Sequence, residues 1–240
     1  MAVPLTHLQG RSIGVFGLAR SGLATIAAAR AGDAAEIFVW DDKEEARGAA
    51  AELGGMPLTP PEWPWDRLDS LVLSPGVPLT HPKPHPIVAL ARRAEVEIVS
   101  DIELLWREGT GRARFVGITG TNGKSTTAAL IGHVLDAGGL AVSVGGNIGR
   151  AALDLEPPEE SRVYVLELSS YQLDLTHRFR PDVAIWLNLT PDHLDRHGSM
   201  IGYAKAKARI FLNMTAEDVG VAGIDEAEMQ AVARAIHYQG

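Results

Sequence analysis

The sequence predicts an α/β protein in which two successive units each build a mostly parallel sheet. Apolar runs of strand length alternate with helical patterns along the whole chain, and such alternation is typical of βαβ units. A glycine-rich turn follows the first strand of each series, GLARSG early in the chain and GITGTNGKST in the middle. At 240 residues the chain is also longer than a usual single domain.

The first series supplies four strands and two helices. We expect the strands at residues 13–16, in EIFVWDD, in DSLVLSPG and at residues 97–99, and the helices through residue 30 and over residues 87–94. Residues 78–86 hold four prolines and two histidines, which favours a loop between the third strand and the second helix.

The second series begins with the middle glycine-rich turn. We expect strands in RFVGITG, VYVLELSS, DVAIWLNLT and DVGVAGID, and helices over residues 125–137 and 203–212. The boundary falls near Asp101, which divides the chain into domains of residues 1–101 and 102–240. Because this series stops one helix after its last strand, with no element left to close the sheet, we expect the second domain to be truncated.

Composition and charge exclude several classes of function. The formal charge of −8 argues against nucleic acid or an anionic membrane as the main partner. The chain has no cysteine, which excludes disulfides, thiolate metal sites and a cysteine nucleophile. Its apolar runs are far shorter than the roughly 20 residues that span a bilayer, and MAVPLTHLQGRS lacks the pattern of a signal peptide. We therefore expect a soluble cytoplasmic protein.

The stretch GITGTNGKST predicts a phosphate-binding loop, although the usual pattern has glycine where this chain has Ile118. Unpaired N–H groups at the start of the following helix would attract a phosphate. Lys124 would reach the terminal phosphates, and the hydroxyl of Ser125 or Thr126 would bind Mg²⁺. The alternative is a glycine turn with a polar helix cap.

Two further candidates follow the next strands of the same series. Glu167 ends the strand in VYVLELSS, where ligands of open parallel sheets bind, and Mg²⁺ commonly takes one or two carboxylates plus phosphate oxygens. His193 and Asp192 lie in NLTPDHLDRH, directly after the next strand. Each candidate alone could equally be a solvated side chain, but their occurrence on successive strands favours a shared site.

Lys207 lies on the same helical face as Tyr203 and Phe211, while Lys205 points away. Taken alone, this position favours a lysine that extends its charge to solvent along an apolar stem.

In the first series, GLARSG is similar to a dinucleotide-binding turn with Ala19 in place of its middle glycine, which weakens the prediction of a pyrophosphate site. Asp41 and Asp42 end the second strand and could accept hydrogen bonds from a ribose or a base. A plain strand-to-helix turn is the alternative.

Together these motifs resemble the Mur ligase family along essentially the whole chain. The resemblance is carried by GLARSG, SPG at residues 74–76, SDIEL, GITGTNGKST, GGNIG, LELSSYQL, DHLDRH and the YxxxK pair at residues 203 and 207. The family's loop has the form GxxGTxGK[ST], which accounts for Ile118. SDIEL and the serine after Gly-Lys resemble the branch that adds D-glutamate.

The resemblance implies an ATP-dependent ligase that joins D-glutamate to UDP-N-acetylmuramoyl-L-alanine through an acyl phosphate, with two Mg²⁺ ions, in peptidoglycan precursor synthesis. It also implies a Rossmann-like first domain, a P-loop-type central domain that is incomplete here, and a C-terminal amino-acid-binding domain that this sequence lacks. Two alternatives stay open: a module that binds a UDP-sugar or ATP without forming the amide, and a Mur-type ligase for another amino acid.

The resemblance assigns roles to residues that match the family's motifs. The residues implied to bind ATP are Gly120, Thr121, Asn122, Gly123, Lys124, Ser125 and Thr126. Those implied to bind the UDP substrate are Arg20, Asp42, Ser74, Pro75, Gly76, Asn147 and Ser169. The implied metal ligands are Ser125, Glu167, His193 and Lys207, the last as a carbamate. Lys124, Lys207 and His193 are the implied catalytic residues.

Overall fold

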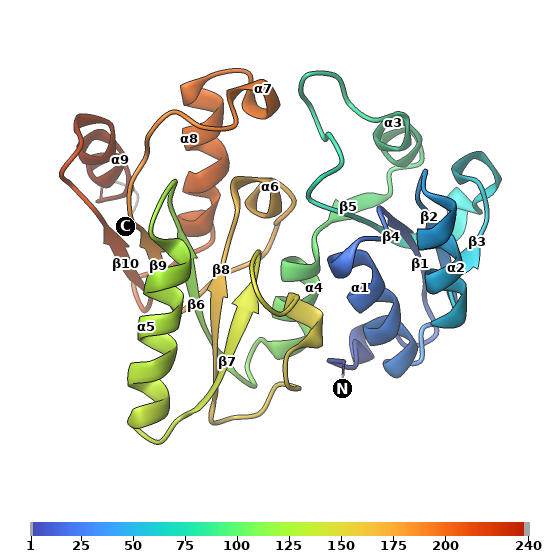
Figure 1. Ribbon diagram of the computed structural model, residues 1–240, viewed down its shortest axis with the longest axis horizontal. Helices are drawn as coiled ribbons and strands as arrows, with labels where there is room; N and C mark the ends of the chain where they lie inside the picture. Colours follow the sequence, from blue (N-terminus) through green and yellow to red (C-terminus); the bar gives the residue numbers. More distant parts are fainter. Residues whose placement is uncertain (1, 238–240) are drawn as a thin grey trace.

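Two five-stranded sheets form the framework of the computed structural model, which describes residues 2–237 (Figure 1). The strand pairings of the described residues are all parallel. The predicted α/β class with parallel sheets is therefore confirmed. Within residues 2–237, no helix is both long enough and apolar enough to cross a membrane.

The N-terminal sheet has the strand order β3-β2-β1-β4-β5. Its strands are β1 (Ser12–Phe16), β2 (Glu36–Trp40), β3 (Met56–Pro57), β4 (Leu68–Leu73) and β5 (Glu97–Val99), and its helices are α1 (Arg20–Ala31), α2 (Glu44–Glu52) and α3 (Pro86–Arg93). The chain adds β2 and β3 on one side of β1 and then β4 and β5 on the other, so the strand order changes direction between β1 and β4. Ligands of open parallel sheets bind beyond the strand ends at such a point, so the loops after β1 and β4 lie where a ligand is expected.

The C-terminal sheet has the order β10-β9-β6-β8-β7. Its strands are β6 (Arg114–Thr119), β7 (Ala141–Gly146), β8 (Arg162–Glu167), β9 (Val183–Trp186) and β10 (Val219–Ala222). Its helices are α5 (Lys124–Ala137), α6 (Ser170–Leu173), α7 (Leu194–His197), α8 (Met200–Ala208) and α9 (Ala227–His237). Because β8 and β9 flank β6, the ends of the three predicted site strands meet at one edge.

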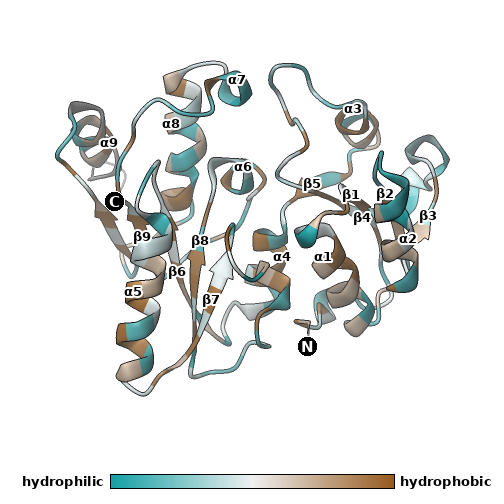
Figure 2. Ribbon diagram, in the orientation of Figure 1, coloured by the Kyte–Doolittle hydropathy of each residue, from teal (hydrophilic) through white to brown (hydrophobic). Residues whose placement is uncertain are grey.

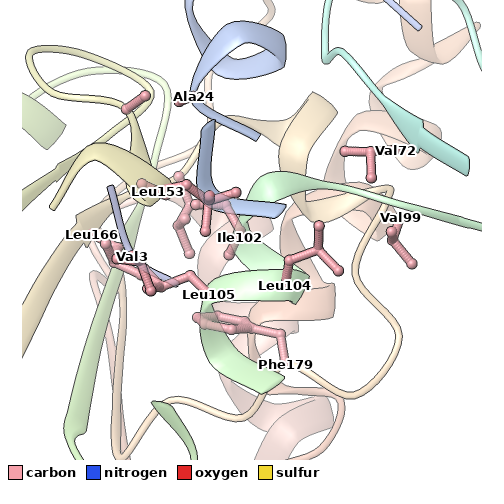
Figure 3. Packing of buried hydrophobic residues seen from close by; sticks show 14 of the residues in the cluster. Val3, Ala24, Val72, Val99, Ile102, Leu104, Leu105, Leu153, Leu166 and Phe179 are labelled. Atoms are coloured by element: carbon pink, nitrogen blue, oxygen red, sulfur yellow. The ribbon is translucent and has the colours of Figure 1, made fainter. Parts of the chain in front are cut away.

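Helix α4 (Asp101–Gly109) lies between the two sheets. Its apolar residues belong to one buried cluster that draws on both sheets (Figure 3), including Val72, Val99, Ile102, Leu104, Leu105, Leu166 and Phe179. The backbone N–H of Val3 also donates to the carbonyl of Leu153 at 2.9 Å. The two sheets therefore share a core, while polar elements such as α7 lie outside it (Figure 2).

Several elements differ from the sequence prediction. Helices α2, α4, α6 and α7 and strands β3 and β7 were not expected, and the strand predicted in DVAIWLNLT ends at Trp186. It ends there because the next residues turn toward the loop after β6, where the backbone N–H of Thr121 donates to the carbonyl of Asn188 at 3.2 Å. The predicted helix over residues 203–212 begins earlier, at Met200, and finishes as a 3₁₀ turn.

Candidate functional site

The loop after β6 has the geometry of an anion-binding turn. Gly123, the residue before α5, has φ of 83°, a left-handed conformation that favours glycine. The backbone N–H of Thr127 donates to the carbonyl of Gly123 at 3.0 Å. The N–H groups of Lys124, Ser125 and Thr126 precede this first helical bond, so they are the donors that a phosphate would use.

Asn188, which sequence reasoning missed, fixes the shape of this loop. Its Oδ1 accepts hydrogen bonds from the backbone N–H groups of Thr121 at 3.0 Å and Asn122 at 2.9 Å. Its Nδ2 donates to the carbonyl of Asn122 at 3.1 Å. The two loop amides are thus already paired, and the anion site is left to the residues at the helix start. The position of Asn188 shortly after β9, a strand that ends beside the site, was the one sequence signal that could have identified this residue.

Two lysines converge on the carbonyl of Gly120. Lys124 Nζ donates to this oxygen at 2.9 Å and also to the carbonyl of Thr121 at 2.9 Å. Lys207 Nζ reaches the same Gly120 oxygen at 2.8 Å and lies 4.6 Å from the ring centroid of Tyr203. Lys207 is only 2% exposed, so the alternative of a solvent-directed lysine is wrong. Burial, together with the charge of Lys124, lowers the pKa of Lys207 to about 7.

Glu167 is buried at the end of β8, beside the start of α5. Its Oε2 accepts a hydrogen bond from Ser125 Oγ at 2.7 Å, and its Oε1 accepts one from Asn147 Nδ2 at 3.3 Å. The backbone N–H of Asn147 donates to the carbonyl of Glu167 at 2.9 Å. A hydroxyl and a carboxylate therefore meet beside the phosphate loop, and oxygen atoms of this kind are the ligands that Mg²⁺ prefers.

His193 lies at the rim of this site. It has φ of 50°, its side chain is 47% exposed, and its Nε2 lies 3.3 Å from Asp192 Oδ2. Its ring centroid is 5.0 Å from that of Tyr171 and 6.4 Å from that of Tyr203. His193 thus lies beside the ring of Tyr203, which Lys207 also contacts, and about half of its side chain is open to solvent.

His197, the second histidine of DHLDRH, is buried and was not singled out from the sequence. Its Nε2 lies 2.9 Å from Ser170 Oγ, and its ring stacks on Tyr171 at 5.4 Å between centroids. Burial and the neighbouring positive charge of Arg196 lower the pKa of His197 to about 4. A neutral imidazole at physiological pH therefore joins α7 to α6.

Two arginines cross between the sheets in opposite directions, and we call Arg20 and Arg196 the reciprocal arginine pair. Arg20, at the start of α1, donates to the carbonyls of Asn147 at 2.9 Å and Gly149 at 2.6 Å. Arg196, in α7, donates to three carbonyls of the loop after β4, those of Pro75 at 3.3 Å, Gly76 at 2.8 Å and Val77 at 3.1 Å. Arg20, from the N-terminal half, therefore holds the loop after β7, and Arg196, from the C-terminal half, holds the loop after β4. Both loops contain residues predicted to bind the UDP substrate.

A cavity of ≈ 140 Å³ lies between the two halves of the chain, beside Arg20, and we call this region the joint between the sheets. It is lined by Ala19, Arg20, Ser21, Pro75, Asp101, Gly146, Asn147, Ala151 and Gln172. Three residues predicted to bind the UDP substrate, Arg20, Pro75 and Asn147, line this one cavity. Ser74 lines the adjoining hollow between β1 and β4.

The remaining predicted substrate residues, Asp42, Gly76 and Ser169, are not among the residues that line this cavity. Gly76 and Asp42 are exposed, and Ser169 caps α6, its Oγ accepting from the backbone N–H of Gln172 at 3.2 Å. Asp41 contacts the turn after β1, since its Oδ2 accepts from the backbone N–H of Leu18 at 2.7 Å. The carboxylate that shapes this turn is therefore the neighbour of the predicted Asp42.

The chain matches curated proteins along its whole length. The chain is 50% identical over 242 residues to "UDP-N-acetylmuramoylalanine--D-glutamate ligase" of Paramagnetospirillum magneticum, covering 100% of this chain and 52% of that protein. It is 48% identical to the protein of the same name from Brucella abortus, covering 99% of this chain and 51% of that protein. The chain thus spans about half the length of the curated relatives it matches.

Two solved structures share the fold. The "UDP-N-acetylmuramate:L-alanyl-gamma-D-glutamyl-meso-diaminopimelate ligase (MPL) from Neisseria meningitides" matches with a TM-score of 0.62 at 18% identity, covering 94% of this chain and 75% of that chain. The murein peptide ligase mpl from Psychrobacter arcticus matches with a TM-score of 0.55 at 14% identity, covering 96% of this chain and 52% of that chain.

The sequence profile of the family described as "Mur ligase middle domain" matches residues 118–240, just over half of the chain. This match begins in β6 and includes the phosphate loop, Glu167, His193 and Lys207. The chain therefore belongs to the Mur ligase family.

Proposed function

We propose that this chain carries the nucleotide and UDP-sugar sites of an ATP-dependent ligase that joins D-glutamate to UDP-N-acetylmuramoyl-L-alanine. The observation that carries the proposal is the meeting of Lys124, Lys207, Ser125 and Glu167 around one phosphate loop. The names of the relatives that match along the whole chain support the choice of substrates. We also propose a cytoplasmic location for the protein.

The proposed reaction has two steps. A carboxylate oxygen of the UDP-sugar attacks the γ-phosphorus of ATP, the bond to the β,γ-bridging oxygen breaks, and ADP leaves. The amine of D-glutamate then attacks the carbonyl carbon of the acyl phosphate and loses a proton, and inorganic phosphate leaves with its bonding electrons. A carboxylate that approaches a polyphosphate meets strong repulsion, which Lys124 and the N–H groups at the start of α5 would offset.

Mg²⁺ would be held by Ser125, Glu167, His193 and Lys207, the last as a carbamate, with two ions expected. Within residues 2–237, no three or more histidine, aspartate and glutamate side chains cluster closely enough to hold a metal ion by themselves. The Ser125–Glu167 pair nevertheless fits an ion that arrives with ATP, because Mg²⁺ commonly keeps phosphate oxygens and water among its ligands. When bound, it would neutralise charge on the phosphates and orient them.

A carbamate on Lys207 is favoured by its surroundings. Only the neutral amine adds CO₂: the ammonium group first loses one proton to solvent, the nitrogen then bonds to the carbon of CO₂, and a second proton leaves, so that a cation becomes an anion. Burial lowers the pKa of Lys207 to about 7, so the neutral form is well populated near that pH. The product would also replace the repulsion between Lys207 and Lys124 by attraction.

The UDP-sugar would bind at the joint between the sheets. We assign to it Arg20, Asp42, Ser74, Pro75, Gly76, Asn147 and Ser169. We also propose that residues 1–101 form the domain that holds the UDP-sugar and residues 102–240 part of the domain that holds ATP. The D-glutamate contacts are then expected in the part of the relatives' length that this chain does not span.

The test measures phosphate release by the full-length protein with ATP, Mg²⁺ and UDP-N-acetylmuramoyl-L-alanine, with and without D-glutamate. We expect release that depends on D-glutamate and is lost in Lys124→Ala, while Lys205→Ala, which changes an exposed lysine of α8, keeps it. Release with another amino acid alone would indicate a different Mur-type ligase. Binding of both nucleotides without release would indicate a binding module.

A further inference from the structure

Asp101 carries a buried carboxylate oxygen that has no hydrogen-bond partner within residues 2–237. The side chain begins α4 and is 3% exposed. Its Oδ1 accepts from the backbone N–H of Ile102 at 3.0 Å and from Gln172 Nε2 at 3.5 Å, whereas its Oδ2 accepts from no protein group. A buried polar atom left without a partner costs free energy, so this oxygen calls for an explanation.

The unpartnered oxygen belongs to the residue that lines both the cavity at the joint and the hollow between β1 and β4. The same cavity is lined by Ala19, Arg20 and Ser21, at the start of the 12-residue helix α1. No side chain caps this helix, and its first N–H bond runs from Leu23 to the carbonyl of Ala19 at 3.0 Å. The N–H groups before Leu23 are therefore donors for an anionic oxygen.

An anion at the start of α1 would share a cavity of ≈ 140 Å³ with the carboxyl group of Asp101. Arg20 is the one other charged residue in the cavity lining, and its guanidinium already donates to the carbonyls of Asn147 and Gly149. The side chains that face the cavity from the loop after β4, from the loop after β7 and from α6 are uncharged.

The other nearby acids are engaged elsewhere. Glu103, on the same helix as Asp101, accepts from the backbone N–H groups of His177, Arg178 and Phe179. Glu167 lies beyond Asn147, bonded to Ser125. An ionised Asp101 would therefore repel a bound phosphate at close range, and Arg20, which already donates to two carbonyls, is the one cation in the cavity lining.

We propose that Asp101 is a ligand-contacting carboxyl group that takes up one proton when a nucleoside diphosphate binds and donates it in a hydrogen bond to a phosphoryl oxygen. The proton comes from solvent, and no other bond forms or breaks. The inference rests on the proposed function, because the UDP-sugar supplies the diphosphate. Burial already raises the pKa of Asp101 to about 6, so protonation near neutral pH requires only a modest further shift.

The test is calorimetric titration of the full-length protein with UDP-N-acetylmuramoyl-L-alanine at pH values from 5.5 to 8, in buffers of different ionisation heat. The bridging diphosphate of this ligand, unlike the terminal phosphate of UDP, does not titrate in this range. We expect proton uptake that is largest near neutral pH, above the pKa of Asp101 in the free protein, and an affinity that falls there by up to about tenfold per pH unit. Asp101→Asn, which keeps a hydrogen-bond donor and cannot titrate, should take up no proton and bind at pH 8 at least as tightly as the wild type. Asp66→Asn, at an exposed acid of the N-terminal part, should behave like the wild type.

Two results would overturn the inference and leave the proposed function standing. One is binding of the UDP-sugar without proton uptake by the wild type. The other is an affinity that rises with pH and is weakened at every pH by Asp101→Asn, which would make Asp101 an ionised acceptor for a ligand hydroxyl or N–H. Failure of wild-type protein to bind the UDP-sugar at any pH would contradict the proposed function itself. If Asp101→Asn does not fold, the buffer dependence of the wild type still decides the question.

Discussion

At the scale of single residues, the phosphate loop owes its shape to side chains that come from outside it. Asn188 pairs two of the loop's amides and one of its carbonyls. The lysines of α5 and α8 meet on the carbonyl of Gly120. The loop is therefore preorganised by the segment that follows β9 and by lysines of α5 and α8, and its anion-binding geometry does not depend on the glycine residues alone.

Replacing Asn188 by Ala is expected to weaken ATP binding by the full-length protein about tenfold or more. The substitution removes three hydrogen bonds of about 1 kcal/mol each, and the loop must then be ordered when the nucleotide binds. Titration calorimetry with ATP and Mg²⁺ measures the effect. Asn213→Ala is the matched control, since Asn213 also donates to two carbonyls, those of His177 and Phe179, away from the loop. Equal affinities for the two variants would contradict the role given to Asn188.

Asp101 should make the protein less stable as the pH rises from about 4 to about 6. Its folded-state pKa of about 6 lies above the ordinary value of 3.8, so the folded protein holds the proton more tightly. The stabilisation is complete below pH 4 and is lost above pH 6, where ionisation costs up to about 3 kcal/mol at about 1.4 kcal/mol per pKa unit. Urea unfolding at pH 5 and pH 8 should show that Asp101→Asn is the more stable protein only at pH 8. If the wild type and Asp101→Asn differed by the same free energy of unfolding at both pH values, this prediction would be refuted.

At the scale of elements, α4 anchors the segment that leads into β9. The carboxylate of Glu103 is fully buried and accepts from the backbone N–H groups of His177, Arg178 and Phe179 at 2.9 to 3.1 Å. It also accepts from Arg107 Nε at 3.1 Å. The carboxylate of Glu103 thus supplies the hydrogen-bond acceptor for the backbone N–H groups of this turn.

Glu103→Gln should destabilise the protein by about 2 to 4 kcal/mol, because it removes a buried acceptor with several charge-assisted bonds. The control is Glu97→Gln, which changes the other partner of Arg107, bonded at 2.7 Å. Glu97 is 35% exposed, so its loss should cost about 1 kcal/mol or less. Denaturant unfolding compares the two, and a Glu97 variant as unstable as the Glu103 variant would be inconsistent with the anchoring role.

Two of the elements that the sequence failed to predict, β7 and α4, hold polar residues that are buried by distant partners. Strand β7 escaped prediction because AVSVGG has few large apolar residues, and Ser143 is buried only because its Oγ donates to Glu156 Oε2 at 2.6 Å. Helix α4 escaped it because Asp101 and Glu103 resemble an exposed boundary, while their contacts lie at Gln172 and at residues 177–179. In contrast, β6 and α5 were predictable because their glycine-lysine-serine turn is a local signal.

At the scale of the whole molecule, the parallel sheets and the loops that face each other were predictable, but the joint between them was not. Strand alternation indicates parallel sheets, and loops at the carboxyl ends of parallel strands converge. The reciprocal arginine pair and the cavity beside it depend on how the two sheets are placed, which no local pattern encodes. Accordingly, Lys124 and Glu167 could be identified from the sequence, whereas Arg196 and Asp101 could not.

Arg196→Ala should weaken binding of the UDP-sugar about tenfold and leave ATP binding unchanged, although Arg196 belongs to the C-terminal half. It removes the bonds that hold the carbonyls of Pro75, Gly76 and Val77, so the loop after β4 becomes freer and must be ordered by the ligand. Titration with each ligand measures the two affinities. Arg93→Ala, at an exposed arginine of α3, is the control. If ATP binding were weakened and binding of the UDP-sugar were unchanged, Arg196 would instead support the phosphate loop.

The most direct test of the central claim follows the oxygen atoms of the substrate. The full-length protein is given UDP-N-acetylmuramoyl-L-alanine with both carboxylate oxygens labelled with ¹⁸O, together with ATP, Mg²⁺ and D-glutamate, and the released phosphate is analysed by mass spectrometry. Since the attacking carboxylate oxygen remains bonded to phosphorus when the amide forms, each phosphate should carry one ¹⁸O atom. Unlabelled phosphate would show that ATP is hydrolysed without activating the carboxylate, and would contradict the proposed ligase mechanism.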